Sequence, residues 1–182
     1  MPVNEAGEII IKSQTMMLGY WNKPEETAEM IRGEWLYTKD TGCMDEEGYV
    51  KFLGRTREMI KCSGFSVFPA EVEHLLYAHP AVKEAAVIGV NDAYRGTSPK
   101  AFIVLKDGYA GTVTDRQILD WCKDNMAAYK RPKFVEFRES LPRTAAGKLQ
   151  KIALEHEEQT ASASPPSPIA RSAQRSTRIC RY

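Results

Sequence analysis

Segments typical of strands alternate with segments typical of helices from residue 59 to residue 157, and this alternation restricts the chain to a mixed fold. Residues 84–90 and 101–105 are two apolar runs of strand length. Pro69 opens a segment whose apolar residues follow the i, i+3, i+4 spacing of a helix. About 100 residues of this kind can bury a core of their own. The sequence therefore predicts a compact α+β domain.

Local signals define the elements of this domain. Ser63-Gly64 lies between two short apolar runs and predicts the turn of a β-hairpin. Thr114 and Gln117 have the spacing of a capping box, which starts a helix. We expect a fold in which this hairpin and a three-stranded sheet are packed by helices. Strands are expected at 59–62, 65–68, 84–90, 101–105 and 133–137, helices at 69–78, 114–126 and 150–157, and a polar loop at 91–99.

The first residues of the chain carry strand and turn signals without the apolar positions of a closed core, so another part of the protein should cover them. The last residues are mostly Ala, Ser, Pro and Arg, a composition typical of disorder. We therefore divide the chain into a β-rich segment at 1–53, a compact domain at 54–155 and a disordered tail at 156–182. Within the first segment, strands are expected at 8–12, 35–37 and 49–53, and a short helix at 24–31.

Composition excludes several classes of protein. The 25 Lys and Arg residues nearly balance the 24 Asp and Glu residues, so nucleic acid is not an expected partner. The longest apolar stretch, Ala85–Val90, is far shorter than the ~20 residues of a transmembrane segment. The four cysteines lack CxxC spacing and a nearby His pair, which argues against a metal site. We interpret them as reduced thiols in a cytoplasmic protein.

Three local features carry chemistry. Lys148 follows a loop bounded by Pro142 and Gly147, where a lysine can approach phosphate or carboxylate oxygens. A solvated surface lysine is the alternative, and a P-loop is excluded because its first glycine and final hydroxyl residue are absent. Residues 54–58 are either a hinge with an anion-contacting arginine or a charged linker. Asp40, just after a predicted strand, is either a ligand for a sugar diol or the acceptor of a local turn.

The order of these features resembles the C-terminal third of the adenylate-forming enzymes, which include acyl-CoA synthetases, adenylation domains and luciferases. Within that family, the segments SGFSVFPAEVE and RPKFVEFRESLPRTAAGK look most like those of fatty-acyl-CoA synthetases, particularly the long-chain group. The matching residues run in order through Gly7-Glu8-Ile9, Gly19-Tyr20-Trp21, Pro24-Glu25-Glu26-Thr27, Tyr37-Thr38-Lys39-Asp40, Gly54-Arg55, Ile60-Lys61, Gly64, Pro69-Ala70-Glu71-Val72-Glu73, Tyr129-Lys130-Arg131-Pro132, Leu141-Pro142-Arg143-Thr144 and Gly147-Lys148.

The resemblance implies a role for each matching residue. Asp40 would bind the ribose hydroxyls of ATP, and Arg55 would contact the same nucleotide. Lys148 would be the catalytic residue, which reaches the α-phosphate and the attacking carboxylate during adenylation. Arg57 would be the hinge about which the small domain rotates between the two half-reactions.

After that rotation, the hairpin with Lys61 and Gly64 would face CoA, and a glycine there would allow close approach of the pantetheine arm. This chain departs from the family pattern at two positions. Lys39 stands where glycine usually precedes the ribose-binding aspartate, and Arg57 stands where the hinge is more often Asp or Lys.

The resemblance also implies missing parts. The triphosphate-binding loop and the glutamate that holds Mg²⁺ belong to a large N-terminal adenylation domain, which also contains the acyl pocket. ATP, CoA and a fatty acid would be the substrates of the whole protein, and this chain alone is expected to be inactive. A carrier-protein-loading adenylation domain and a non-catalytic C-terminal subunit remain alternatives. The expected location is cytoplasmic, with peripheral contact to a membrane as an option.

Overall fold

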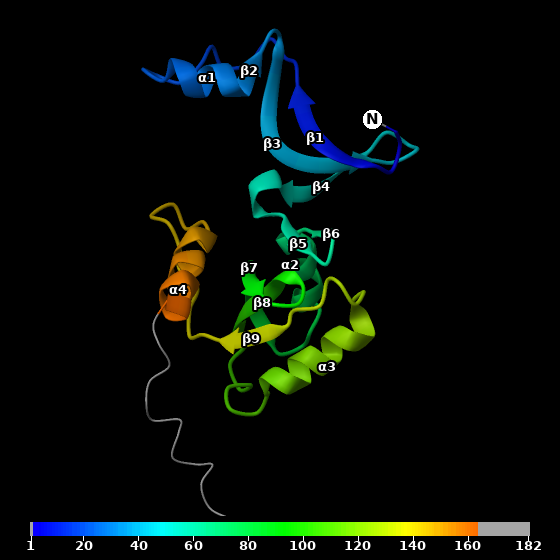
Figure 1. The fold of residues 1–182 in the computed structure, drawn as a ribbon, viewed down its shortest axis with the longest axis vertical. Coiled ribbons are helices and arrows are strands. Elements are labelled where there is room, and N and C mark those ends of the chain that lie inside the picture. The colour runs from blue at the N-terminus through cyan, green and yellow to red at the C-terminus, as the bar shows by residue number, and fades with distance from the viewer. Residues whose placement is uncertain (1, 164–182) are drawn as a thin grey trace, which may run out of the picture.

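The computed structural model describes residues 2–163, which form two parts stacked along the longest axis of the molecule (Figure 1). The upper part contains β1 to β4, and the lower part contains β5 to β9 with three helices around them. Most of the predicted tail, residues 164–182, lies outside the described residues.

The upper part is a small antiparallel sheet built on one long strand. Strand β3 pairs with β1 on one side, and β2 and β4 also pair with it. Only Thr41 and Gly42 are buried among residues 2–53, so this sheet has no closed core in the described part of the chain. Its elements are β1 (Ala6–Ile11), α1 (Pro24–Met30), β2 (Ile31–Arg32), β3 (Trp35–Met44) and β4 (Val50–Arg55).

Strand β3 corrects the expectation for residues 35–40. The strand does not end at Tyr37 but continues to Met44, so Asp40 lies within it rather than after it. This polar stretch can form a strand because β1 pairs with it as far as Cys43 and β4 pairs with it from Asp40 onward. Hydrogen bonds from two neighbouring strands satisfy its backbone, and such bonds do not require apolar side chains. The sequence of this stretch therefore lacks the apolar alternation that would indicate a strand.

The lower part confirms the α+β prediction. Strand β8 lies at the centre of a five-stranded sheet, antiparallel to β7 and parallel to β9. The predicted hairpin, β5 with β6, joins this sheet where Cys62 pairs with Gly96. The elements are η1 (Thr56–Glu58), β5 (Ile60–Cys62), β6 (Phe65–Val67), α2 (Pro69–Tyr77), β7 (Val82–Asp92), β8 (Gly96–Leu105), α3 (Asp115–Asn125), β9 (Phe134–Phe137) and α4 (Lys151–Ala163).

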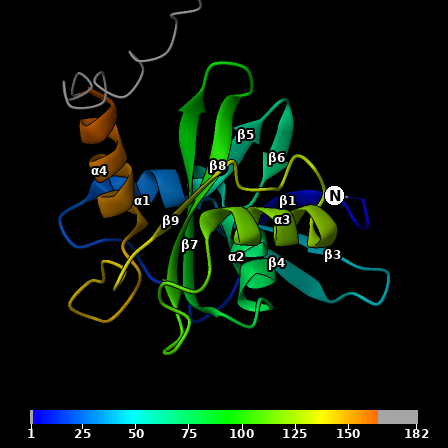
Figure 2. The same cartoon turned by 90° about the horizontal axis from the view of Figure 1, so that it is seen from below.

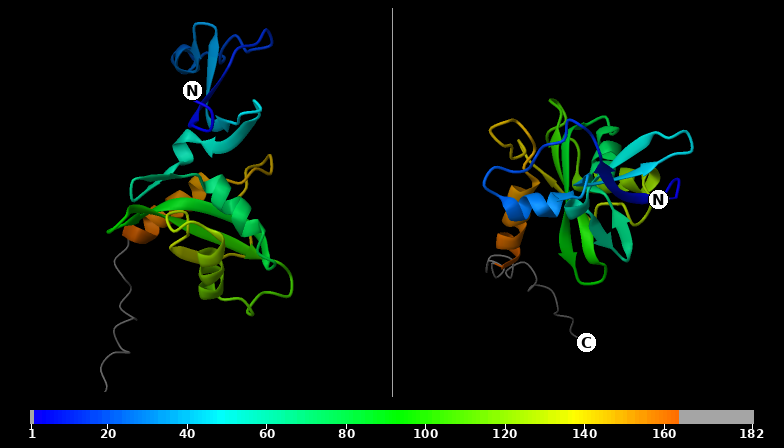
Figure 3. Two further views of the ribbon diagram at one scale, coloured as in Figure 1. Left: turned by 90° about the vertical axis from the view of Figure 1, so that its right-hand side faces the viewer. Right: turned by 90° about the horizontal axis from the view of Figure 1, so that it is seen from above.

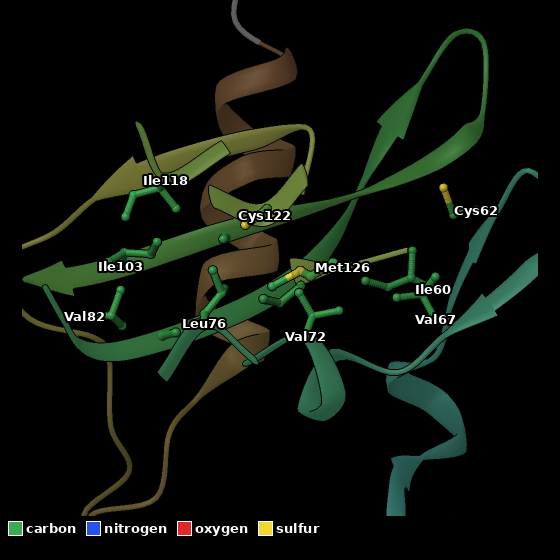
Figure 4. Packing of buried hydrophobic residues seen from close by; sticks show 13 residues of the cluster. Ile60, Cys62, Val67, Val72, Leu76, Val82, Ile103, Ile118, Cys122 and Met126 are labelled. Carbon is green, nitrogen blue, oxygen red and sulfur yellow. The ribbon is translucent and has the colours of Figure 1, made fainter. Parts of the chain in front are cut away.

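Both faces of this sheet are buried. Alternate residues such as Val82 and Ile103 face the core formed with α2 and α3 (Figure 4). The intervening residues, such as Ile88 and Phe102, pack against Leu154 of α4 in a second core. Helices α3 and α4 accordingly lie on opposite sides of the sheet (Figures 1 and 3). Burial on two faces explains why β7 and β8 are continuous apolar runs in the sequence.

The turn between β7 and β8 is shorter than the loop expected at 91–99. Strand β7 extends to Asp92 and β8 begins at Gly96. The buried Asp92 carboxylate accepts hydrogen bonds from the Ser98 hydroxyl and the Lys133 ammonium (2.8 Å). These bonds hold the pKa of Asp92 well below its usual range. A charged carboxylate therefore fixes a turn that appears only polar in the sequence.

Helix α4 corrects the boundary expected for the tail. It runs to Ala163, whereas residues from 156 onward were expected to be disordered. Glu157 pairs with Arg138 (2.9 Å), and Glu158 pairs with Lys100. These charged contacts to the sheet stabilise the second half of a helix whose apolar pattern ends at Leu154.

Replacing Leu154 tests whether one side chain anchors α4. The side chain is fully buried against Ile88 and Phe102, so Leu154→Ala removes its packing and leaves a cavity. We expect a loss of about 2–4 kcal/mol in the free energy of unfolding, measured by urea denaturation of this chain. Ile152→Ala, on the exposed side of α4, is the control and should change stability little. Equal effects of the two substitutions would contradict this packing.

Candidate functional site

The loop that carries Lys148 is closed by its own hydrogen bonds. The Thr144 N–H donates to the Lys148 carbonyl (2.8 Å), and the Gly147 N–H donates to the Thr144 carbonyl (2.8 Å). The Lys148 N–H donates in turn to the Thr144 hydroxyl (3.2 Å). Gly147 has φ = +77°, a left-handed conformation that favours glycine. The backbone of the loop is therefore ordered while the Lys148 side chain faces solvent.

Arg143 attaches this loop to the sheet. Its guanidinium donates to the Gly147 carbonyl (2.9 Å) and pairs with Glu84 of β7 (2.6 Å). Arg143 and Leu149 also form an isolated antiparallel bridge across the base of the loop. The backbone position of Lys148 is consequently held by contacts to β7.

A cavity of about 730 Å³ brings together three of the residues singled out in the sequence. Lys148 lines it from the loop, and Arg55 and Arg57 line it from the segment that joins the two sheets. The rest of its wall comes from Glu58, Thr144, Glu155 and residues 149–152. Residues more than 90 positions apart in sequence thus share one site between the upper sheet and the lower domain.

The charges in this cavity suit an anion. Arg55 lies 3.6 Å from Asp40, and Lys151 pairs with Glu58 (3.2 Å). Within residues 2–163, neither Lys148 nor Arg57 has an ion-pair partner. Two cations without acidic partners at one cavity can bind phosphate or carboxylate oxygens.

Asp40 contacts Arg55, one of the residues that line this cavity. It pairs with Arg55 across β3 and β4, and its backbone N–H donates to the Thr38 hydroxyl (3.1 Å). A second cavity, of about 560 Å³, is lined by Thr38, Lys39, Arg55 and Arg57 among others. Because Arg55 and Arg57 line both cavities, the two spaces adjoin at these residues. Asp40 itself lines neither cavity and reaches them through its contact with Arg55.

Lys39 has a strained backbone at the position where the family pattern has glycine. Its φ of +58° lies in the left-handed region, which costs an L-residue roughly 1–2 kcal/mol. The Glu8 carboxylate accepts a hydrogen bond from the Lys39 N–H (2.9 Å), and the Lys39 ammonium pairs with Glu29 (3.2 Å). These contacts hold the strained residue in place, directly before Asp40.

The hairpin residues lie apart from this cavity. Lys61 donates to the Ser66 hydroxyl across the hairpin (2.9 Å), and Gly64 occupies the turn with φ = +85°. A Cβ atom on Gly64 would meet nothing within 4 Å, so the turn is open. Figures 1 and 2 place this hairpin and α4 on opposite sides of β7 and β8. In this arrangement Lys148 and Gly64 do not share a site.

Two partly buried ion pairs link the sequence motifs and were missed from the sequence. Glu71 of α2 pairs with Lys130, in the segment before β9. Glu73 of the same helix pairs with Lys151 (2.8 Å), the first residue of α4. The sequence did not indicate these partners, because each pair joins residues that are far apart in the chain and meet only in the folded domain.

Metal and membrane features are absent from residues 2–163. Within this range, no three His, Cys, Asp or Glu side chains are grouped so as to hold a metal ion, so none of these residues is assigned to Mg²⁺. No helix in the same range is long and apolar enough to span a membrane. Cys43, Cys62 and Cys122 are free thiols, and burial raises the pKa of Cys122 to about 11.

Comparisons with known proteins agree on one family. Residues 71–148 match the family described as AMP-binding enzyme C-terminal domain. The chain is 48% identical over 155 residues to a long-chain-fatty-acid–CoA ligase of Bacillus subtilis, covering 85% of this chain and 27% of that protein. It is 45% identical over 150 residues to a benzoate–CoA ligase of Thauera aromatica, covering 82% and 28% of the two chains.

Solved structures agree with these sequence matches. The anthranilate CoA ligase AuaEII, in complex with anthranoyl-AMP, superposes with a TM-score of 0.83 at 42% identity. That match covers 90% of this chain and 32% of the other. In the sequence comparisons, the chain spans about 27% of the length of the curated relatives that it matches first.

The strain at Lys39 can be tested by comparing two substitutions. Lys39→Gly and Lys39→Ala both remove the pair with Glu29, but only glycine relieves the left-handed backbone. We expect strand β3 in the glycine variant to be about 1 kcal/mol more resistant to local opening than in the alanine variant. Hydrogen exchange of the β3 amides measures this difference. An alanine variant at least as resistant would contradict the assigned strain.

Proposed function

We propose a function from the premise that this chain belongs to the AMP-binding enzymes, whose C-terminal domain it carries at residues 71–148. In this proposal, the chain is the C-terminal portion of an ATP-dependent acyl-CoA ligase. The whole enzyme first joins a carboxylic acid to ATP, giving acyl-adenylate and pyrophosphate. The thiol of CoA then attacks the acyl-adenylate, giving the thioester and AMP.

One observation carries this proposal: Lys148 and Arg57 line a common cavity without acidic partners in the described chain. Adenylation brings a carboxylate towards the α-phosphate, and negative charge develops as pyrophosphate leaves. The ammonium of Lys148 stabilises that charge from a loop whose backbone is already ordered. Arg55 contacts the nucleotide beside it, and Asp40 accepts hydrogen bonds from the ribose hydroxyls.

The second half-reaction needs a different face of the domain. Rotation about Arg57 withdraws Lys148 and turns the hairpin with Lys61 and Gly64 towards the acyl-adenylate. The separation of this hairpin from Lys148 in the structure supports two alternating positions. The open turn at Gly64 leaves room for the pantetheine arm to approach the backbone.

An N-terminal adenylation domain completes the site. Five apolar side chains of the upper part are more than half exposed, and we assign them to contact with that domain: Leu18, Trp21, Tyr49, Val50 and Phe52. The triphosphate site, the Mg²⁺ ligands and the acyl pocket belong to it as well. Three free thiols in the described chain support a cytoplasmic location for the whole protein.

A fatty acid is the proposed substrate. Five relatives, from Bacillus, Escherichia and Salmonella strains, are named long-chain-fatty-acid–CoA ligases, whereas others are named for benzoate and feruloyl groups. The test uses the complete protein with palmitate, benzoate and ferulate, and with CoA or a carrier protein as acceptor. Palmitoyl-CoA formation supports the proposal. An aromatic thioester would change the acid, and transfer only to the carrier protein would refute CoA as the acceptor.

Lys148→Ala in the complete enzyme tests the role of the lysine. We expect acid-dependent pyrophosphate release to fall by at least about 100-fold, because the charge in the adenylation transition state loses its cation. Thioester formation from supplied acyl-adenylate should stay within about threefold of the unsubstituted enzyme. Lys106→Ala, on the exposed surface, is the control. An equal loss in both half-reactions would refute this division of roles.

Gly64→Leu should have the opposite effect. The leucine side chain fills the approach of the pantetheine arm, so thioester formation should fall by about tenfold or more while adenylation persists. The substitution also strains a residue with φ = +85°. Gly108→Leu is the matched control, because Gly108 has φ = +86° and equally open surroundings. Similar losses in both variants would mean that strain, rather than access, is responsible.

A further inference from the structure

The proposed hinge segment is η1 (Thr56–Glu58), and its two ends are held by different parts of the molecule. The Thr56 hydroxyl lies 2.9 Å from the hydroxyl of Thr41 in β3 of the upper sheet, within hydrogen-bonding distance. The Glu58 carboxylate pairs with Lys151 of the lower domain (3.2 Å). Between them, Arg57 makes no side-chain hydrogen bond or ion pair within residues 2–163. Thr56 is thus attached to the upper sheet and Glu58 to the lower domain, and the Arg57 side chain is attached to neither.

Lys151 occupies the centre of the lower attachment. It is the first residue of α4, three positions after Lys148, and its side chain is 15% exposed. Its ammonium lies between Glu58 of η1 and Glu73 of α2, which is 2.8 Å away. Glu73 in turn accepts a hydrogen bond from the Val87 N–H of β7 (2.7 Å). One ammonium thus joins the end of the Lys148 loop, the hinge segment and the core of the domain.

Electrostatics make this arrangement depend on the lysine. Without Lys151, Glu58 and Glu73 would face each other as two mostly buried carboxylates, 27% and 13% exposed. Glu73 cannot move away easily, because it is bonded to the backbone of β7. The repulsion would therefore displace Glu58 and open η1.

We propose that Lys151 is a positioning residue for Lys148, an inference that rests on the proposed function. By holding η1 against α2, it makes Glu58 move with the lower domain and confines the rotation to Arg57. The same ammonium fixes the exit of the Lys148 loop relative to the hinge. Each rotation then returns Lys148 to the same place in the adenylation site.

A matched control exists at another charged contact of α4. Lys100 also lies between two glutamates, Glu136 (2.8 Å) and Glu158, and its side chain is 13% exposed. It anchors α4 but does not contact η1. Lys100→Met and Lys151→Met should therefore weaken the packing of α4 similarly, while only Lys151→Met affects the hinge.

The first experiment needs no enzymatic activity and uses this chain. The Met59 N–H donates to the Thr56 carbonyl (3.3 Å) and closes η1, so its hydrogen exchange reports the opening of the hinge segment. We expect exchange at Met59 to become about tenfold faster in Lys151→Met and to stay unchanged in Lys151→Arg and Lys100→Met. Unchanged exchange in Lys151→Met would overturn the inference, whatever reaction the whole protein catalyses.

The second experiment uses the complete enzyme. In Lys151→Met, kcat for adenylation should fall by about tenfold, with KM for ATP within about threefold, because Lys148 is misplaced rather than removed. Lys151→Arg should restore the rate, and Glu58→Gln should add no loss to Lys151→Met. An equal fall in both half-reactions, or the same fall in Lys100→Met, would overturn the positioning role. An unsubstituted enzyme that activates no carboxylic acid would instead refute the proposed function.

Discussion

Strand β8 is the constraint on which the rest of the lower domain depends. It pairs with β7 along its whole length, with β9 at Lys100–Ile103 and with the hairpin at Gly96. Its side chains alternate between the core shared with α2 and α3 and the core shared with α4. Because α4 packs on this strand, the loop that precedes the helix and carries Lys148 also depends on it. The position of the cavity that Lys148 lines therefore depends on the burial of both faces of β8.

Much of this fold could be predicted from the sequence, because its strongest signals are local. The apolar runs of β7 and β8, the capping box at Thr114 and the turn at Gly64 each act over a few residues, and each forms as expected. The length of β3 could not be predicted, because pairing with β1 and β4 compensates for its polar residues. The second half of α4 depends on ion pairs with Lys100 and Arg138, which lie far away in sequence.

The candidate site also contains residues that could be predicted from local motifs and residues that could not, because their contacts are long-range. The order of motifs identified Lys148, Arg55 and Arg57, and the structure places all three at one cavity. The departure at Lys39 was visible as a missing glycine, and its positive φ gives the physical reason for that glycine. The partners of Lys151 could not be predicted, because Glu58, Glu73 and Lys151 meet only after three elements have packed together. Sequence motifs identify the residues that meet a ligand more readily than those that hold them in place.

The parallel pairing of β9 with β8 has a consequence for the order of assembly. β7 and β8 join through a three-residue turn, whereas β9 reaches β8 only after a connection that contains α3. Short-range contacts form before long-range ones, because closing a longer loop costs more chain entropy. We therefore expect the β7–β8 hairpin to fold early, and β9, α4 and the loop of Lys148 to dock late; pulse-labelled hydrogen exchange that protects β9 before β7 would contradict this order. A nascent chain would then complete the loop that carries Lys148 only after the sheet of the domain has formed.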